Sequence, residues 1–261
     1  MIDSPSTAPI VCMFECLSDN YGYLIHHPAS KQTICIDSPD ADLILAKAKS
    51  LNWKITQIWN THWHPDHAGG NAKIQSETGC DIWGPQEVKS RLTAPLDTVL
   101  SGGETLKLGE LDVFVLATPG HTLQHISYYI PAISSAFVGD TLFALGCGRM
   151  FEGNPTMFWD SLQKLRALPD NTKIYCAHEY TLSNLKFAES VEPNNEDLKA
   201  YARTARALRQ QDKPTIPTLM SAEKACNPFL RSDDSLLQTQ LGTKSDSVET
   251  FALLRKMKDD F

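Results

Sequence analysis

The segment that decides the fold reads Thr61-His62-Trp63-His64-Pro65-Asp66-His67. The run before it, residues 56–60, is short, apolar and β-favouring, which predicts a buried strand that ends where the segment begins. A loop after a strand lets successive side chains converge. Side chains of this kind packed together without a cation would repel one another and lose hydration with nothing to offset the cost. The segment therefore predicts a metal site, with the expected ligands His62, His64, Asp66 and His67.

Composition narrows the class of protein. The chain has 261 residues, of which 42% are hydrophobic, enough for one large domain or for a large domain with a small second domain. Its formal net charge of -7 argues against nucleic acid as a partner, because phosphate binding needs a basic surface. No apolar run approaches the ~20 residues of a transmembrane helix, and the N-terminus lacks the basic and apolar parts of a signal peptide. We expect a globular, cytoplasmic protein that binds neither nucleic acid nor membrane.

Isolated cysteines and histidines carry a weaker signal than the segment at 61–67. The seven cysteines are an odd number without paired spacing, which is typical of reduced thiols. Cys176 lies in an apolar run, where a small buried residue is a better interpretation than a nucleophile. His26, His27 and His125 are interpreted as ordinary packed residues, because single histidines more often form hydrogen bonds than bind metal.

The first two thirds of the chain alternate short β-favouring runs with turns. Helical spacing of apolar residues is confined there to residues 41–50 and 157–168. This mixture is typical of stacked sheets with helices outside, an α/β sandwich. The predicted strands are Val11–Cys16, Tyr21–Ile25, Thr33–Ile36, Gln57–Asn60, Asp81–Trp83, Asp112–Thr118, Ile126–Ile130 and Ala136–Val138.

The pattern changes after residue 178. Apolar residues then recur with helical spacing over 182–190, 195–211 and 247–258, and proline-bearing stretches separate these segments. We therefore expect two domains, a catalytic domain over residues 1–179 and a smaller helical domain over residues 180–261.

Three later apolar runs also end in a ligand-type residue, at His121, Asp140 and His178. Each would deliver its ligand to the same edge of a sheet, for a total of five imidazoles and two carboxylates. A tetrahedral ion uses only four ligands, so the set predicts two ions that share a bridging carboxylate and a bridging water. Nitrogen-rich ligation without thiolate suits zinc, and iron or manganese are the alternatives.

The pattern T-H-x-H-x-D-H followed by single His, Asp and His ligands is similar to that of the metallo-β-lactamase superfamily, which implies an αββα sandwich. A narrower resemblance, to the glyoxalase II (hydroxyacylglutathione hydrolase) family, covers essentially the whole chain. In that family a smaller helical domain closes over the substrate, which agrees with the change after residue 178. The motifs that carry the resemblance are Asp19–Tyr21, Gly139–Arg149, Ala177–Thr181, Asn227–Arg231 and Leu254–Phe261.

The resemblance implies a division of the ligands between two ions. Asp66 and Asp140 would also be catalytic, Asp66 because it orients the attacking hydroxide while it binds metal. The first ion would take His62, His64 and His121, and the second Asp66, His67 and His178, with Asp140 bridging.

The resemblance also implies the residues that bind glutathione, which by position are Arg149, Phe151, Tyr180, Arg255 and Lys258. Two of them depart from the family pattern. Arg149 replaces a lysine and keeps its charge, whereas Phe151 replaces a tyrosine and loses a hydroxyl group. Glutathione carries two carboxylates, so a few cations in an acidic protein make chemical sense as local anion-binding groups.

The implied activity is hydrolysis of S-(2-hydroxyacyl)glutathione, with S-D-lactoylglutathione giving glutathione and D-lactate, in methylglyoxal detoxification. A hydroxide that bridges the metals would attack the thioester carbonyl, and a thiol with a pKa of ~8.5 can leave without a strong general acid. We expect a monomer that acts on this small molecule. The alternatives are a lactonase or β-lactamase of the same superfamily, a mononuclear-iron persulfide dioxygenase, and a degenerate scaffold that binds a partner through the old pocket.

Overall fold

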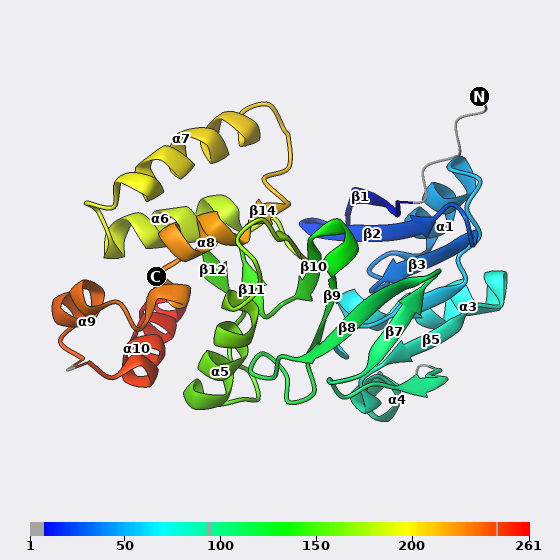
Figure 1. Ribbon diagram of the computed structural model, residues 1–261, viewed down its shortest axis with the longest axis horizontal. Helices are drawn as coiled ribbons and strands as arrows, with labels where there is room; N and C mark the ends of the chain where they lie inside the picture. The colour runs from blue at the N-terminus through cyan, green and yellow to red at the C-terminus, as the bar shows by residue number, and fades with distance from the viewer. Residues whose placement is uncertain (1–7, 93–94, 244) are drawn as a thin grey trace. The chain divides into compact units, whose positions relative to one another are not determined.

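The structure, a computed structural model, describes residues 8–92, 95–243 and 245–261 (Figure 1). The chain forms two compact units. Unit 1 comprises Met1–Ala117 and Gln124–Phe137, and unit 2 comprises Thr118–Leu123 and Val138–Phe261. No helix within the described ranges is long and apolar enough to cross a membrane.

Unit 1 contains a six-stranded sheet in the order β1-β2-β3-β4-β5-β6. The first three strands pair antiparallel, and β3 to β6 pair parallel. Parallel neighbours need a crossover connection, which helices α1 (Ala41–Ser50), α3 (Asn71–Thr78) and α4 (Gln86–Leu92) supply. The strands are β1 (Ile10–Cys16), β2 (Asn20–His27), β3 (Gln32–Ile36), β4 (Gln57–Trp59), β5 (Asp81–Gly84) and β6 (Thr98–Val99).

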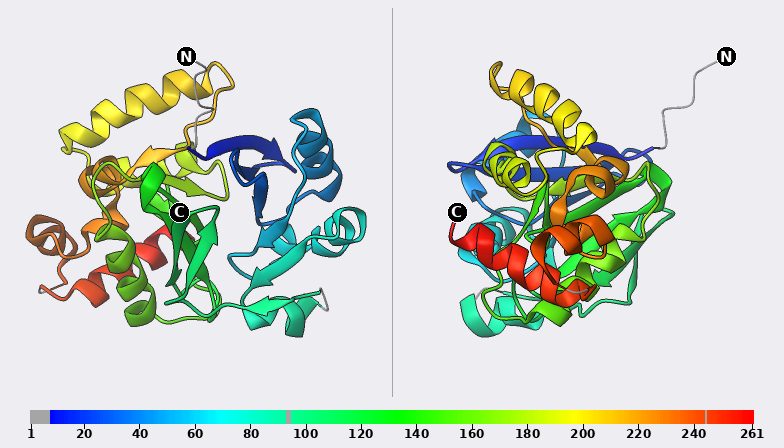
Figure 2. Two further views of the ribbon diagram at one scale, coloured as in Figure 1. Left: turned by 45° about the vertical axis from the view of Figure 1, so that its right-hand side comes forward. Right: turned by 90° about the vertical axis from the view of Figure 1, so that its left-hand side faces the viewer.

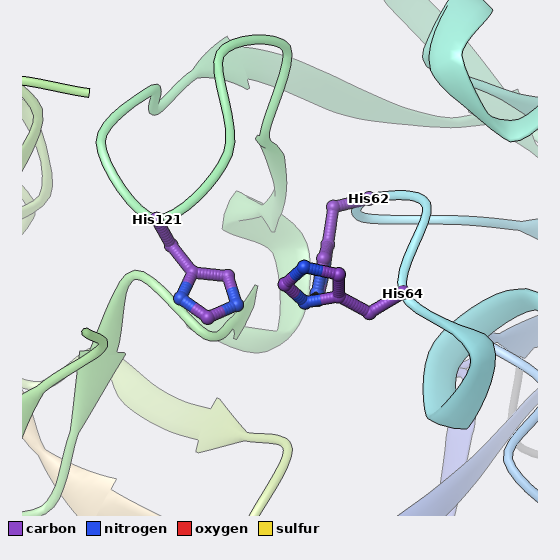
Figure 3. Close-up of side chains that lie close together, drawn as sticks. All are labelled: His62, His64 and His121. Carbon is purple, nitrogen blue, oxygen red and sulfur yellow. Dashed lines mark hydrogen bonds between the residues drawn. The ribbon is translucent and has the colours of Figure 1, made fainter. Parts of the chain in front are cut away.

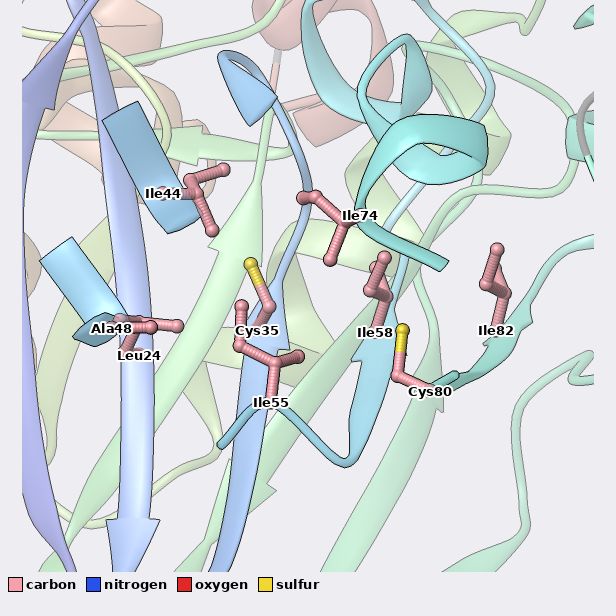
Figure 4. Packing of buried hydrophobic residues seen from close by; sticks show 9 residues of the cluster. All are labelled: Leu24, Cys35, Ile44, Ala48, Ile55, Ile58, Ile74, Cys80 and Ile82. Atoms are coloured by element: carbon pink, nitrogen blue, oxygen red, sulfur yellow. The ribbon is translucent and has the colours of Figure 1, made fainter. Parts of the chain in front are cut away.

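Helices α1 and α3 cover one face of this sheet. Ile44 and Ala48 from α1 and Ile74 from α3 pack on buried residues of the strands, including Ile58 of β4 (Figure 4). Because this apolar cluster is buried, it stabilises β3 and β4 and so fixes where the residues that follow these strands begin.

The other face of the sheet packs on four antiparallel strands, of which the fourth contributes only residues 135–137 to unit 1. Tyr23 lies edge-on to Phe137, and Trp59 stacks on Tyr128, each with ring centroids 5.4 Å apart. The strands are β7 (Thr105–Leu108), β8 (Leu111–Ala117), β9 (Ile126–Ile130) and β10 (Ser135–Gly139), with the 3-10 helix η1 (Pro131–Ile133) between the last two. Unit 1 is therefore a helix–sheet–sheet sandwich.

Unit 2 is largely helical. Asn154, Asn195 and Asp246 each precede a helix, and their side chains accept a hydrogen bond from an N–H of the first turn, which fixes where the helix begins. The helices are α5 (Pro155–Arg166), α6 (Thr181–Val191), α7 (Glu196–Arg209), α8 (Met220–Cys226), η2 (Pro228–Arg231), α9 (Ser235–Leu241) and α10 (Ser247–Asp259). The strands are the hairpin β11 (Leu142–Phe143) and β12 (Gly146–Cys147), and the pair β13 (Lys173–Cys176) and β14 (Thr218–Leu219).

Helices α6, α7 and α8 share one apolar core within unit 2. Leu185 and Ala188 of α6 pack with Leu198 and Ala202 of α7 and with Cys226 of α8. The α6 and α7 helices lie side by side (Figure 2). These residues recur at helical spacing, which is the pattern that predicted helices in this part of the chain.

The predicted strands and long helices are present, within one to three residues at their ends. One local expectation is wrong. The segment at 61–67 is not wholly a loop, because Pro65 begins a single helical turn, α2 (Pro65–Ala68), which contains two of the expected ligands. The pattern also gave no sign of α4, α8, α9 or the β11–β12 hairpin, which are all seven residues or shorter. The boundary between residues 179 and 180 stays a prediction.

Candidate functional site

Unit 1 carries four of the expected ligands directly after β4. His62 and His67 are buried, and His64 and Asp66 are partly buried. Nε2 of His62 lies 3.0 Å from Nδ1 of His64, and Nε2 of His67 lies 3.4 Å from Oδ2 of Asp66. The predicted convergence of these side chains is therefore present within this unit.

A buried carboxylate orients the ligand segment. Asp37, just beyond β3, accepts hydrogen bonds from the Thr61 N–H at 2.7 Å and from the Thr61 hydroxyl at 2.8 Å. Its Oδ2 also lies 2.9 Å from Nδ1 of His67. A carboxylate only accepts, so Nδ1 carries the proton and Nε2 of His67 keeps its lone pair for a metal.

Asn20 supports the second half of the segment. Its amide donates to Oδ2 of Asp66 at 3.1 Å and to the Asp66 carbonyl at 3.3 Å. Sequence reasoning assigned no role to Asn20 or Asp37. The signal for Asp37 existed, because it follows an apolar strand as the expected ligands do.

Unit 2 carries the other three expected ligands. Oδ2 of Asp140 lies 3.4 Å from Nε2 of His121, and Oδ1 lies 3.4 Å from Nε2 of His178. Nδ1 of His121 lies 2.8 Å from the carbonyl oxygen of Arg149, to which it donates, so Nε2 again keeps its lone pair. Gly139, with φ of 49°, allows the turn that aims Asp140, a backbone angle that favours glycine.

These separations fit a metal centre. When zinc binds four ligands tetrahedrally at about 2.0–2.1 Å, neighbouring ligand atoms lie about 3.3 Å apart. The ligand pairs within each unit are separated by 3.0–3.4 Å. All the donor atoms are imidazole nitrogens and carboxylate oxygens, which suit zinc, iron or manganese.

Three groups of ligand-type side chains could each hold an ion. Figure 3 shows His62 and His64 of the first group, whose rings approach each other within unit 1. His125, although it stacks on His62 with centroids 4.9 Å apart, is in none of the groups. The groups are His62, His64 and His121; His62, His67 and Asp140; and Asp66, His67 and His178.

The five expected glutathione-binding residues line one cavity of unit 2, with a volume of about 530 Å³. Its wall also includes the ligands His121 and Asp140. The cavity therefore combines cations, aromatic rings and metal ligands. The five residues are Arg149, Phe151, Tyr180, Arg255 and Lys258.

Lys258 is a partly buried cation in the wall of this cavity. Its ammonium donates to the carbonyl of Ser183 at 3.2 Å and to the hydroxyl of Ser183 at 3.1 Å, and it lies over the rings of Phe187 and Phe261. Partial burial, and then the neighbouring charges of Arg255 and Arg149, lower the pKa of Lys258. A bound anion would offset both effects.

Arg255 holds two elements of unit 2 together in addition to lining the cavity. Its side chain is 5% exposed, and Nη1 donates to the carbonyls of Cys147 at 2.9 Å and Gly148 at 3.4 Å. Nη2 donates to Oδ1 of Asp259 at 2.9 Å. The guanidinium therefore clamps the end of β12 to α10. Burial raises the pKa of the Cys147 thiol to about 11, which agrees with a packed, unreactive cysteine.

Two aromatic rings lie against ligand imidazoles within unit 2. The Phe151 ring, on a residue 62% exposed, lies 5.3 Å from the ring of His121. Tyr180 stacks on His178 with ring centroids 4.7 Å apart and an interplanar angle of 1°. Each ring limits how its neighbouring imidazole can turn.

The fold and the ligand groups together define a metal-binding protein of the metallo-β-lactamase superfamily, whose family model matches residues 26–178. A second model, described as the hydroxyacylglutathione hydrolase C-terminus, matches residues 179–261. The chain belongs to the hydroxyacylglutathione hydrolase, or glyoxalase II, family.

Relatives named hydroxyacylglutathione hydrolase are similar over nearly their whole length. The one from Hyphomonas neptunium is 50% identical over 248 residues, which is 95% of this chain and 96% of its own. The one from Maricaulis maris is 51% identical over 253 residues, 97% of this chain and 98% of its own. The family expected from the sequence motifs is confirmed.

Solved structures share the fold. ETHE1 from Myxococcus xanthus is similar with a TM-score of 0.69 and 26% identity, covering 95% of this chain and 90% of that one. A metallo-β-lactamase from Staphylococcus aureus has a TM-score of 0.65 at 20% identity, covering 97% and 72% of the two chains. The expected α/β class and metallo-β-lactamase fold are confirmed.

Proposed function

We propose that this protein is a thioester hydrolase that cleaves S-(2-hydroxyacyl)glutathione, with S-D-lactoylglutathione giving glutathione and D-lactate. The observation that carries the proposal is the cavity of unit 2, in which Arg149 and Lys258 line the same wall as the ligands His121 and Asp140. The names of the relatives at about 50% identity support the same activity. This hydrolysis would serve methylglyoxal detoxification in the cytoplasm. The protein would act as a monomer.

We further propose that two divalent ions, most simply zinc, belong to this activity. His62, His64 and His121 would hold the first, and Asp66, His67 and His178 the second, with Asp140 shared. The 3.4 Å approach of a different Asp140 oxygen to each of His121 and His178 supports the shared role. When bound, such ions polarise a carbonyl group and lower the pKa of water towards ~7.

Other residues of the chain bind the substrate and orient the attacking water. Arg149 and Lys258 bind the carboxylates of glutathione by charge-assisted hydrogen bonds, and Phe151 and Tyr180 pack against the tripeptide. Asp66, held by Asn20, orients the water that attacks the thioester carbonyl carbon. The C–S bond then breaks and the electron pair leaves with sulfur as glutathione thiolate, which needs no strong general acid because its pKa is ~8.5.

The chain can be divided by function at residue 179. We propose that residues 1–179 form the catalytic domain and residues 180–261 a helical substrate-binding domain. The C-terminal family model, which matches residues 179–261, supports this division. Two of the cavity's cations, Arg255 and Lys258, come from α10 in this region.

The test is a hydrolysis assay on several acyl-glutathiones with metal quantification of the same sample. We expect turnover of S-D-lactoylglutathione, and loss of that turnover in the variants Asp140→Ala and His64→Ala. Turnover of a lactone or a β-lactam but of no glutathione thioester would overturn the proposal. So would one iron per chain together with oxygen consumption on glutathione persulfide.

A matched pair of lysines on α10 tests the substrate. Lys258→Ala should raise KM for S-D-lactoylglutathione about tenfold, because it removes a cation from the cavity. Lys256→Ala, two positions away, removes an exposed cation that pairs with Asp260, and KM should stay within about twofold. Equal KM values in the two variants would argue against glutathione as the bound group.

A further inference from the structure

The β11–β12 hairpin joins a metal ligand to a substrate contact. Asp140 lies two residues before β11, and Arg149 lies two residues after β12. The ends of the hairpin pack closely, since a Cβ atom added at Gly148 would collide with the carbonyl oxygen of Asp140. The carbonyl of Arg149 also accepts from Nδ1 of His121. A shift of the hairpin would therefore move Arg149 and release His121 together.

The tip of this hairpin is held by buried side chains as well as by the pairing of its own strands. Leu145 has φ of 59°, a conformation that costs energy for a residue with a branched side chain. Its N–H donates to Oε2 of Glu223 at 2.9 Å. Asn184 donates to the carbonyl of Ala144 at 3.0 Å.

Asn227 completes the attachment. Its amide nitrogen lies 3.0 Å from the carbonyl oxygen of Gly146, 3.3 Å from that of Phe143 and 2.9 Å from Oε2 of Glu223. Its Oδ1 accepts from the Phe229 N–H at the start of η2. Glu223 and Asn227 are both fully buried.

Glu223 is the buried carboxyl group at the centre of this network. A buried carboxyl group carries a large desolvation cost, which hydrogen bonds offset in part. Glu223 accepts three such bonds, at Oε1 from the hydroxyl of Thr218 at 2.8 Å and at Oε2 from Leu145 and Asn227. Two of these donors, Leu145 and Asn227, lead directly to the hairpin tip.

We propose that Glu223 and Asn227 are positioning residues, which fix the tip of the β11–β12 hairpin and so hold Arg149 and His121 in the geometry that binds the glutathione thioester. The inference rests on the proposed hydrolase activity and assigns that activity two residues outside the cavity wall. Neither lines the cavity, and both contact the backbone of residues 143–146, through which they act.

Two substitutions of Glu223 separate the effect of its hydrogen bonds from the effect of its volume. In Glu223→Gln, the amide oxygen can still accept from Leu145 and Asn227, and the NH2 group can donate to Thr218 Oγ1. In Glu223→Leu, the side chain keeps a similar volume, but the N–H of Leu145 and the amide of Asn227 lose their acceptor. Gln238→Leu is the matched control, because it removes buried hydrogen bonds to Ser232 and Ser247 in the same unit, away from the hairpin.

We would measure KM and kcat for S-D-lactoylglutathione, the Kd for glutathione by calorimetry, and hydrogen exchange of residues 142–149. Glu223→Leu should raise KM and Kd about tenfold and speed exchange of the hairpin amides at least about tenfold. Glu223→Gln should keep all three within about twofold of the parent. Gln238→Leu should lower the melting temperature without changing KM or hairpin exchange.

A second variant covers failure of Glu223→Leu to fold. Asn227→Ser keeps an N-cap acceptor for η2 but is too short to reach Phe143 and Gly146, and it should give the same rise in KM and exchange. A KM for folded Glu223→Leu or Asn227→Ser equal to that of Gln238→Leu would overturn the inference. The glutathione titration and the exchange need no turnover, so an inactive parent protein would count against the proposed function alone.

Discussion

Oδ2 of Asp37 lies 2.9 Å from Nδ1 of His67, although the two residues are 30 positions apart and follow different strands. Strands β3 and β4 pair parallel, so the residues that follow them emerge at the same edge of the sheet. The same carboxylate also holds Thr61, the first residue of the ligand segment. Asp37 thus sets the position of the segment at both ends.

We expect Asp37→Asn to weaken metal binding about 10- to 100-fold, because a residue that orients a ligand histidine is worth about that much affinity. Competition with a chromophoric chelator measures the affinity. Asp40→Asn is the control, since it makes the same change three residues away at the N-cap of α1, where asparagine caps equally well. Equal affinities in the two variants would contradict the role of Asp37.

Metal stoichiometry tests the shared carboxylate. The protein loaded with zinc should contain two ions per chain, and Asp140→Ala should retain fewer, because each oxygen of Asp140 faces a different ligand histidine. Treatment with a chelator should abolish thioester hydrolysis, and added zinc should restore it. Elemental analysis alongside activity makes the measurement. A chelated, metal-free sample with full activity would be incompatible with the proposed mechanism.

The ligands could be predicted from the sequence because each follows an apolar run, and strand ends converge in a sheet. Asp37 obeys the same rule, but a single aspartate after a strand is common, and only the folded register of β3 and β4 gives it a partner. The clamp made by Arg255 has no local signal, since its carbonyl partner on Cys147 lies 108 positions away. The same holds for Glu223, whose contact with Leu145 spans 78 positions. The partners of a charged residue on a terminal helix are set by how that helix packs, which the local sequence does not show.

Phe151 offers a gain-of-function test. The family has a tyrosine here, and Phe151 is 62% exposed in the wall of the cavity, so a hydroxyl group can be added without a steric clash in a packed core. Phe151→Tyr should lower KM for S-D-lactoylglutathione about two- to tenfold, the value of one hydrogen bond. The converse change, Tyr180→Phe, should raise it. Steady-state kinetics on both variants decides, and an unchanged KM in both would exclude phenolic hydroxyls from substrate binding.

Arg255 should affect stability as well as substrate affinity. Lysine keeps the charge but cannot hold the carbonyl of Cys147 and the carboxylate of Asp259 at once. We expect Arg255→Lys to lower the free energy of unfolding by about 1–3 kcal/mol in urea denaturation. Lys256→Ala, on an exposed position of the same helix, should change it by less than about 0.5 kcal/mol. A raised KM at unchanged stability would mean that Arg255 acts only on the substrate.

Burial raises the pKa of Glu223 to about 7, from an ordinary value of 4.5, which makes the stability of the protein depend on pH. Between these values the folded protein keeps a proton that the unfolded chain has lost, so the free energy of unfolding falls as pH rises. Below pH 4.5 the carboxyl costs nothing, and above pH 7 the full cost is about 3 kcal/mol. Glu223→Gln carries no charge at any pH. Its stability relative to the parent should therefore rise by about 3 kcal/mol between pH 4.5 and pH 8 in paired urea denaturations.

Taking the difference between variant and parent removes the other titrating groups, including the metal ligands. Glu249→Gln on α10 is the control, because it neutralises an exposed carboxylate and should change stability by less than about 0.5 kcal/mol at either pH. A difference for Glu223→Gln that does not vary with pH would mean that Glu223 is ionised in the folded protein throughout this range. Its hydrogen bonds to Leu145, Asn227 and Thr218 would then fully offset the desolvation of the charge.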